Sequence, residues 1–229
     1  MKALGVVIGD GHGSSEFIRQ AAAWENYSRG RAVAGDVVEV RAFKAASLPI
    51  ARRFDALHTS LSGVTDVKQL AVFCHGWSSG IQLCHGSRVE QLAKLLRAAM
   101  PGTNPDVTLY CCTTGSDLLA STSEVSGSEA PGGDGGFADR LRDELCEAGA
   151  VHCQVDAHTV LGHTTRNPYL RRFEGAGVPT GGVGGHWLVT PRSKLWPRWV
   201  EAMKGDLRWR FPTMTVGQIH GELAQAVAA

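Results

Sequence analysis

Two short segments of this chain combine the residue types that a cysteine nucleophile and its base require. One apolar run ends directly before His75 and Gly76, and a second apolar run leads into the adjacent pair Cys111 and Cys112. In parallel sheets, catalytic groups lie at the carboxyl ends of the strands. A thiol near neutral pH needs a neighbouring base to become a reactive thiolate. The pattern therefore predicts a cysteine-histidine site, with the chemistry of a cysteine hydrolase, where two strands end.

The chain between the two segments is long enough to place them side by side. His75 and Cys112 are 37 positions apart (112 − 75), which accommodates one helix and the strand after it. A right-handed crossover would then bring the two strand ends together. Ser87 and Glu90 form a candidate capping box for that helix, and an apolar stripe at helical spacing follows (Val89, Leu92, Leu96 and Ala99).

Each residue of this pair of segments has an expected role in the predicted site. Successive side chains of a strand point to opposite faces, so only one of Cys111 and Cys112 can face the site, and we expect it to be Cys112. His75 would be its base. Gly76 carries no Cβ, which allows its backbone N–H to approach a substrate. The N–H groups of Gly76 and Cys112 are the expected donors to a developing oxyanion.

The rest of the chain alternates strands with helices. We expect strands over 4–8, 37–43, 70–74, 107–111 and 151–155, and helices after Ser14 or Ser15, around 54–61, over 89–99, after Asp134 and from Thr215. Such alternation is typical of an α/β domain with a mostly parallel, helix-covered sheet in three layers. We expect one domain over 1–229, with an irregular part rich in Gly and Trp from about residue 160.

Composition narrows the class of protein and its partners. The 229 residues are 43% hydrophobic and 20% charged with a net charge of +1, as in an ordinary soluble protein. This charge gives no reason to expect nucleic acid or a membrane surface as a partner. The apolar start of the chain is too short for a signal peptide, and no run approaches the ~20 residues of a membrane span. We therefore expect a cytoplasmic protein.

Six cysteines do not suggest a disulfide framework, and four of them are expected to be buried (Cys74, Cys84, Cys146 and Cys153).

The sequence resembles the caspase-like, clan CD cysteine peptidases, and among them the CHAT-type bacterial branch. Three segments over about residues 66 to 160 carry the resemblance: Val72 to Gly76, Leu109 to Gly115, and Gly132 to Ala138. The resemblance implies a caspase-like fold, His75 as base, Cys112 as nucleophile, and a protein or peptide substrate. It implies no cofactor or metal. Because clan CD folds include inactive members, a silent module that binds a partner through the cleft and the segment 166–173 is an alternative.

Specificity follows from the same resemblance. It implies a substrate pocket at the ends of the first, fourth and fifth strands, where Asp10 and Asp156 are expected. A carboxylate in a narrow pocket favours a Lys or Arg side chain, so cleavage after basic residues is the expectation. His158 is expected to line the same cleft. Asp10 can equally be a turn residue.

A second class of enzyme is possible for the segment 152–163. It is rich in metal-ligand types, and Asp156, His158 and His163, together with His75, could hold a zinc ion for a metal-dependent hydrolase. No recognised zinc-binding spacing is present.

Overall fold

The computed structural model describes residues 1–116, 135–158, 170–175 and 186–189. The strands are β1 (Lys2–Ile8), β2 (Val37–Phe43), β3 (Val67–Phe73), β4 (Gly76–Trp77), β5 (Gly80–Ile81), β6 (Cys84–His85), β7 (Asp106–Tyr110), β8 (Gln154–His158), β9 (Leu170–Glu174) and β10 (His186–Val189). The helices are α1 (Ser14–Arg31), α2 (Ile50–Leu61), the 3-10 turn η1 (Gly86–Arg88), α3 (Val89–Ala99) and α4 (Phe137–Glu147). The expected helix from Thr215 lies outside the described residues.

The main sheet is mostly parallel. Its seven described strands run in the order β10-β9-β8-β7-β3-β1-β2. The pairs from β2 through β1, β3 and β7 to β8 are parallel, whereas β9 is antiparallel to β8 and β10 antiparallel to β9. The expected adjacency of the strands before His75 and Cys112 is confirmed, because β3 pairs directly with β7 and Phe73 lies opposite Tyr110.

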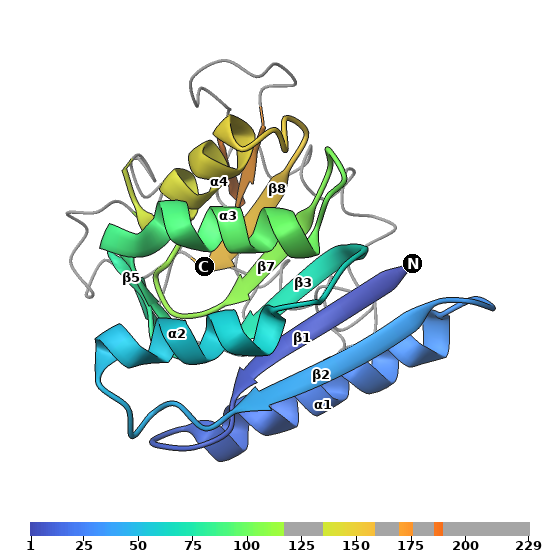
Figure 1. Cartoon of the computed structure of the whole chain (residues 1–229), viewed down its shortest axis with the longest axis horizontal. Coiled ribbons are helices and arrows are strands. Elements are labelled where there is room, and N and C mark those ends of the chain that lie inside the picture. The colour runs from blue at the N-terminus through green and yellow to red at the C-terminus, as the bar shows by residue number, and fades with distance from the viewer. Residues whose placement is uncertain (117–134, 159–169, 176–185, 190–229) are drawn as a thin grey trace, which may run out of the picture.

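Helices cover both faces of this sheet, which makes the α/β architecture three layers deep (Figure 1). On one face, Trp24 of α1 contacts Phe73 of β3. On the other, Val72 lies among leucines of α2, α3 and α4 (Leu57, Leu61, Leu92, Leu96 and Leu141). Val72 and Phe73 are neighbours on β3, and strand alternation therefore sends them to opposite layers. All of these side chains are at most 6% exposed, so the apolar periodicities identified in the sequence do form the core.

Helix beginnings differ from the sequence expectation. Gly13 rather than Ser14 or Ser15 precedes α1, and the expected capping box at Ser87 and Glu90 does not form. Instead, the His85 side chain accepts the Ser87 N–H at 3.2 Å and begins the 3-10 turn η1. The 3-10 turn η1 leads directly into α3, which has no side-chain cap of its own.

Two strands of the second half also differ from expectation. The strand expected over 151–155 is β8 at Gln154–His158, because a turn with Cys153 N–H donating to the Ala150 carbonyl at 2.9 Å occupies the preceding residues. The sequence predicts no strand over the segment 166–173. Its described part instead contributes β9, in which Arg171 and Arg172 are 0% and 4% exposed. Arginines buried in a strand do not appear in a hydropathy pattern, which explains the missed strand.

Candidate functional site

His75 lies directly beyond β3, and its ring is held from several sides. Its Nε2 is 2.9 Å from the backbone carbonyl oxygen of His12, in the loop after β1. A carbonyl can only accept, so this contact selects the tautomer in which Nε2 carries the proton. The edge of Phe17 meets the ring face with centroids 4.9 Å apart and planes at 85°. In this tautomer Nδ1 is the basic nitrogen.

Gly13 lets the loop after β1 approach the His75 ring this closely. Its φ of 78° is in the left-handed region that favours glycine. A Cβ at this position would lie 3.3 Å from Nε2 of His75 and 3.3 Å from the ring of Phe17. The turn from Gly9 to Gly13, with glycine at every second position, therefore presents the His12 carbonyl to the imidazole.

The two adjacent cysteines have opposite environments, as strand alternation predicts. Cys111 is 0% exposed, and its Sγ lies 3.6 Å from Sγ of Cys74 on the neighbouring strand. Burial raises the pKa of the Cys111 thiol well above its usual range. Cys112 is partly exposed, and it is the one cysteine of the six in the chain that is not buried. Of the pair, only Cys112 is therefore accessible to a substrate.

His75 and Cys112 each lie two residues beyond the last paired residues of β3 and β7. The last paired residues are Phe73 and Tyr110. One residue further along, Cys74 and Cys111 are in contact. The next residues after this pair are His75 and Cys112.

Gly76 fits tightly against the turn that contains Cys112. A Cβ at Gly76 would lie 2.6 Å from Cβ of Cys111, 2.6 Å from Cγ2 of Thr114 and 2.9 Å from the Cys112 carbonyl oxygen. The turn itself is fixed by the Thr114 hydroxyl, which donates to the Cys111 carbonyl at 3.1 Å. Thr113 has a φ of 52°, which is uncommon for a β-branched residue and stores strain directly beside Cys112.

The topology explains why these residues meet at this edge. The chain leaves β1 for β2 on one side and later reaches β3 on the other side of β1. Loops after β1 and β3 therefore diverge, and the space between them is where open α/β sheets bind ligands. The contact between His12 and His75 lies at this switch point.

Asp10 is used by the protein to join two loops. Its Oδ1 accepts the backbone N–H groups of Ala45 and Ala46 at 2.7 and 2.9 Å. These hydrogen bonds, that from Ala46 first, lower the pKa of the Asp10 carboxyl. The alternative role as a turn residue is thus visible in the structure, and substrate binding by Asp10 stays a prediction.

Asp156 and His158 both lie inside the sheet. Asp156 is 1% exposed and forms a two-point ion pair with Arg172, at 3.0 Å from Nε to Oδ1 and 3.2 Å from Nη2 to Oδ2. His158 is 0% exposed, packs against Tyr110, and accepts the Gly115 N–H on its carbonyl at 2.8 Å. His158 therefore supports the turn after Cys112 through its backbone. Substrate binding by either side chain stays a prediction.

The expected zinc ligands do not gather in the described part of the chain. Among the described residues, no three His, Cys, Asp or Glu side chains form a group that could hold a metal ion. Asp156 is engaged by Arg172, His158 is fully buried, and His163 lies outside the described residues.

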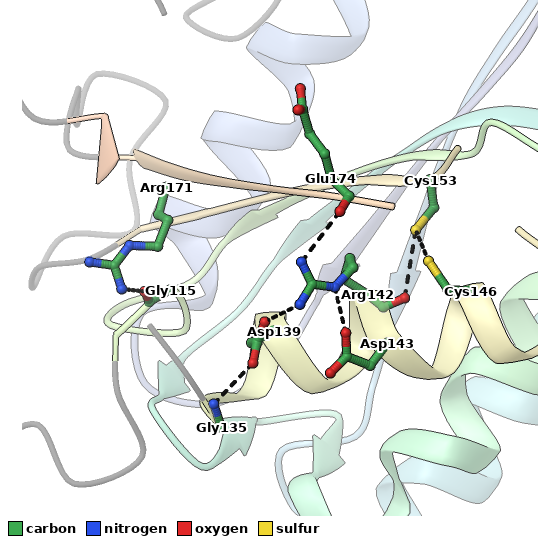
Figure 2. A network of polar contacts seen from close by, with 9 residues as sticks. All are labelled: Gly115, Gly135, Asp139, Arg142, Asp143, Cys146, Cys153, Arg171 and Glu174. Carbon is green, nitrogen blue, oxygen red and sulfur yellow. Dashed lines mark hydrogen bonds and ion pairs between the residues drawn. The ribbon is translucent and has the colours of Figure 1, made fainter. Parts of the chain in front are cut away.

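Sequence reasoning missed two features of this region. The first is the His12 carbonyl, which contacts His75 through its backbone and so leaves no side-chain signal. The second is Arg171, fully buried with Nη1 donating to the Gly115 carbonyl at 3.0 Å, three residues after Cys112 (Figure 2). The Gly-rich turn at 9–13 was the only available signal for the first.

Comparison of the chain with protein-family models, curated proteins and solved structures gives no match. Within the described residues, none of the helices combines the length and the apolar character that crossing a membrane requires.

Proposed function

We propose that this protein is a cysteine hydrolase of caspase-like fold, acting as an endopeptidase or a related acyl hydrolase on a protein or peptide. Cys112 is the nucleophile and His75 its base. The proposal rests on the ends of the neighbouring strands β3 and β7. His75, which the His12 carbonyl orients, follows β3, and Cys112, the one cysteine that is not buried, follows β7.

The proposed mechanism assigns one task to each group. Nδ1 of His75 takes the Cys112 thiol proton, while Nε2–H stays on the His12 carbonyl and stabilises the imidazolium that forms. The thiolate attacks the scissile carbonyl carbon, and the N–H groups of Gly76 and Cys112 donate to the oxyanion. The imidazolium then protonates the leaving group, and water, activated by His75, releases the acyl group from Cys112.

The side-chain faces support this assignment. His75 contacts Phe17 of α1, so it lies on the α1 face of the sheet. Tyr110 stacks on Phe73, which contacts Trp24 of the same helix. Alternation from Tyr110 sends Cys111 to the other face and returns Cys112 to the face of His75. The close fit of Gly76 against the turn that contains Cys112 supports its assignment to the same site.

The test is alkylation of the purified protein with a mild excess of iodoacetamide at pH 6.5, followed by peptide mass mapping. We expect fast labelling of Cys112 alone, because a free thiol with a pKa near 8.5 is mostly unreactive at this pH. His75→Ala should slow it at least tenfold, on the order expected for a general base. His85→Ala, which alters another histidine after β3, is the matched control and should leave the rate unchanged.

Two results would reject the proposal. Slow labelling of Cys112 that His75→Ala does not change would favour the silent binding module, which has no need of an activated thiol. Stoichiometric zinc in the purified protein, lost with His163→Ala together with activity, would favour the metal-dependent hydrolase.

Preference for basic residues is a separate proposal. The Asp156 carboxylate is already neutralised by Arg172, so a Lys or Arg side chain would have to compete with this buried pair. Reporter peptides with Arg, Lys or Asp before the scissile bond would decide it. Preference for Asp would reject the basic pocket without affecting the dyad.

A further inference from the structure

Four of the six cysteines are arranged in two close pairs of buried thiols. Cys74 and Cys111 have their Sγ atoms 3.6 Å apart, and Cys146 and Cys153 have theirs 3.7 Å apart. The second pair joins α4 to the turn before β8, at the amino-terminal edge of the sheet (Figure 2). The first pair lies at the carboxyl-terminal edge, where each cysteine directly precedes a residue of the proposed dyad.

The geometry of the first pair suits a disulfide. Cys74 and Cys111 follow the paired residues Phe73 and Tyr110 on neighbouring parallel strands. Neighbouring strands are about 4.8 Å apart, within the Cα separation that a disulfide spans. Bond formation would bring the sulfur atoms from 3.6 Å to about 2.05 Å. A shift of about 1.5 Å therefore has to occur directly beneath His75 and Cys112.

The surroundings of the Cys111 side chain are tightly packed. Cys111 is 0% exposed, and its Cβ lies only 2.6 Å from the place a Cβ on Gly76 would occupy. Its thiol also donates to the Val72 carbonyl at 3.6 Å, a contact that a disulfide would remove. We expect movement of Cys111 to disturb its packing against Gly76 and the position of the next residue, Cys112.

We propose that Cys74 and Cys111 form a peroxide-sensitive thiol pair whose oxidation to a disulfide switches off the Cys112 site. The Cys74 thiol attacks hydrogen peroxide, the O–O bond breaks, and Cys74 sulfenic acid forms while the thiol proton joins the departing hydroxide as water. Cys111 then attacks the sulfenic sulfur, its proton joins the departing hydroxyl, and water leaves. In total, two thiols are oxidised by two electrons, and one peroxide is reduced to two waters. A dithiol reductant reverses the reaction by thiol–disulfide exchange.

This switch would regulate the proposed Cys112 site and so rests on that proposal, but the Cys74–Cys111 disulfide can be measured independently of it. The full chain is treated with hydrogen peroxide, its remaining thiols are blocked in denaturant, and a non-reducing peptide map is made. The same map on Cys112→Ala excludes cross-links that arise from Cys112. We expect the linked peptides of Cys74 and Cys111 in both proteins.

The effect on the site is measured as the iodoacetamide labelling rate of Cys112 before and after peroxide. We expect a fall of at least tenfold, since a displacement of ~1 Å at a reactive site can cost on the order of a hundredfold, and recovery with dithiothreitol. Because peroxide also oxidises an exposed, activated Cys112 directly, the switch is measured as the part of the fall that Cys111→Ala and Cys74→Ala do not show. Cys153→Ala, which removes the other close pair, should retain it.

The outcomes separate the two proposals. A map with oxidised Cys112 and no Cys74–Cys111 link overturns the thiol pair, as does an equal fall in labelling in Cys111→Ala. A link that leaves the labelling rate unchanged overturns the switch. Unreactive Cys112 in the fully reduced protein would instead reject the proposed hydrolase, while the map on Cys112→Ala still decides whether the pair is oxidised.

Discussion

Replacement of Gly76 by alanine provides the sharpest test of the site geometry. The added Cβ would lie 2.6 Å from Cβ of Cys111, 2.6 Å from Cγ2 of Thr114 and 2.9 Å from the Cys112 carbonyl oxygen. Carbon atoms pack best at about 3.5–4.0 Å, so the neighbours have to move by about 1 Å. Cys111 and Thr114 are both 0% exposed and have no solvent space to move into.

Two effects of this substitution are expected. Overpacking of a tight core costs about 1–3 kcal/mol, and the free energy of unfolding should fall by that amount. The turn with Cys112 is the part that has to shift, and a misplacement of about 1 Å can reduce reactivity on the order of a hundredfold. We therefore expect slow alkylation of Cys112 even at temperatures at which the variant remains folded.

The assay combines urea unfolding, followed by tryptophan fluorescence, with the alkylation rate of Cys112 at pH 6.5. Gly30→Ala is the matched control, because Gly30 is in α1 and an added Cβ would meet nothing within 4 Å. Alanine in a helix should be neutral or more stable by up to ~1 kcal/mol. A Gly76→Ala protein with unchanged unfolding midpoint and unchanged labelling would refute the reasoning about this contact.

Three further predictions concern the framework around the site. Asp156→Asn should lower the free energy of unfolding by about 3–5 kcal/mol by leaving Arg172 buried without its anion, whereas replacing both residues with leucine should recover at least half of that loss in urea titrations. The pKa of the Asp10 carboxyl is lowered in the folded protein, so its ionised form stabilises the fold above the ordinary pKa of 3.8, and this stabilisation is lost as pH falls through the folded pKa. The difference in free energy of unfolding between wild type and Asp10→Asn should therefore shrink between pH 7 and pH 3. A constant difference would contradict this. Gly13→Ala and Gly35→Ala, at φ of 78° and 92°, should each lower the free energy of unfolding by about 1–2 kcal/mol. Only Gly13→Ala, whose Cβ would meet Nε2 of His75, should also slow Cys112 labelling. Equal labelling rates in the two variants would reject the role of the His12 loop.

Local patterns in the sequence were sufficient for most elements of the first half of the chain. The strand at Val37–Phe43 has the expected bounds, and the apolar stripe from Val89 to Ala99 is a buried helix. These elements are predictable because each buries one face at a regular spacing. Helix caps were less predictable, because His85 caps the 3-10 turn η1 and α3 begins without a side-chain cap.

Some features of the candidate site were also predictable from the sequence alone. The order His-Gly and Cys-x-x-Gly after two apolar runs was enough to select His75, Gly76 and Cys112. Alternation along a strand also predicted that one of the two adjacent cysteines would be buried, and that one is Cys111. These conclusions depend only on neighbours in the chain, which a sequence displays directly.

Contacts between distant segments required the tertiary structure. The His12 carbonyl on Nε2 of His75 comes from a backbone atom 63 positions away, which no side-chain type reveals. The ion pair of Asp156 with Arg172 arises because β9 adds antiparallel to β8 and sets the two residues opposite each other. The close thiol pair of Cys74 and Cys111 likewise follows from the register of β3 and β7. Periodicity determines which face of an element is buried, but the pairing of strands decides which buried groups meet.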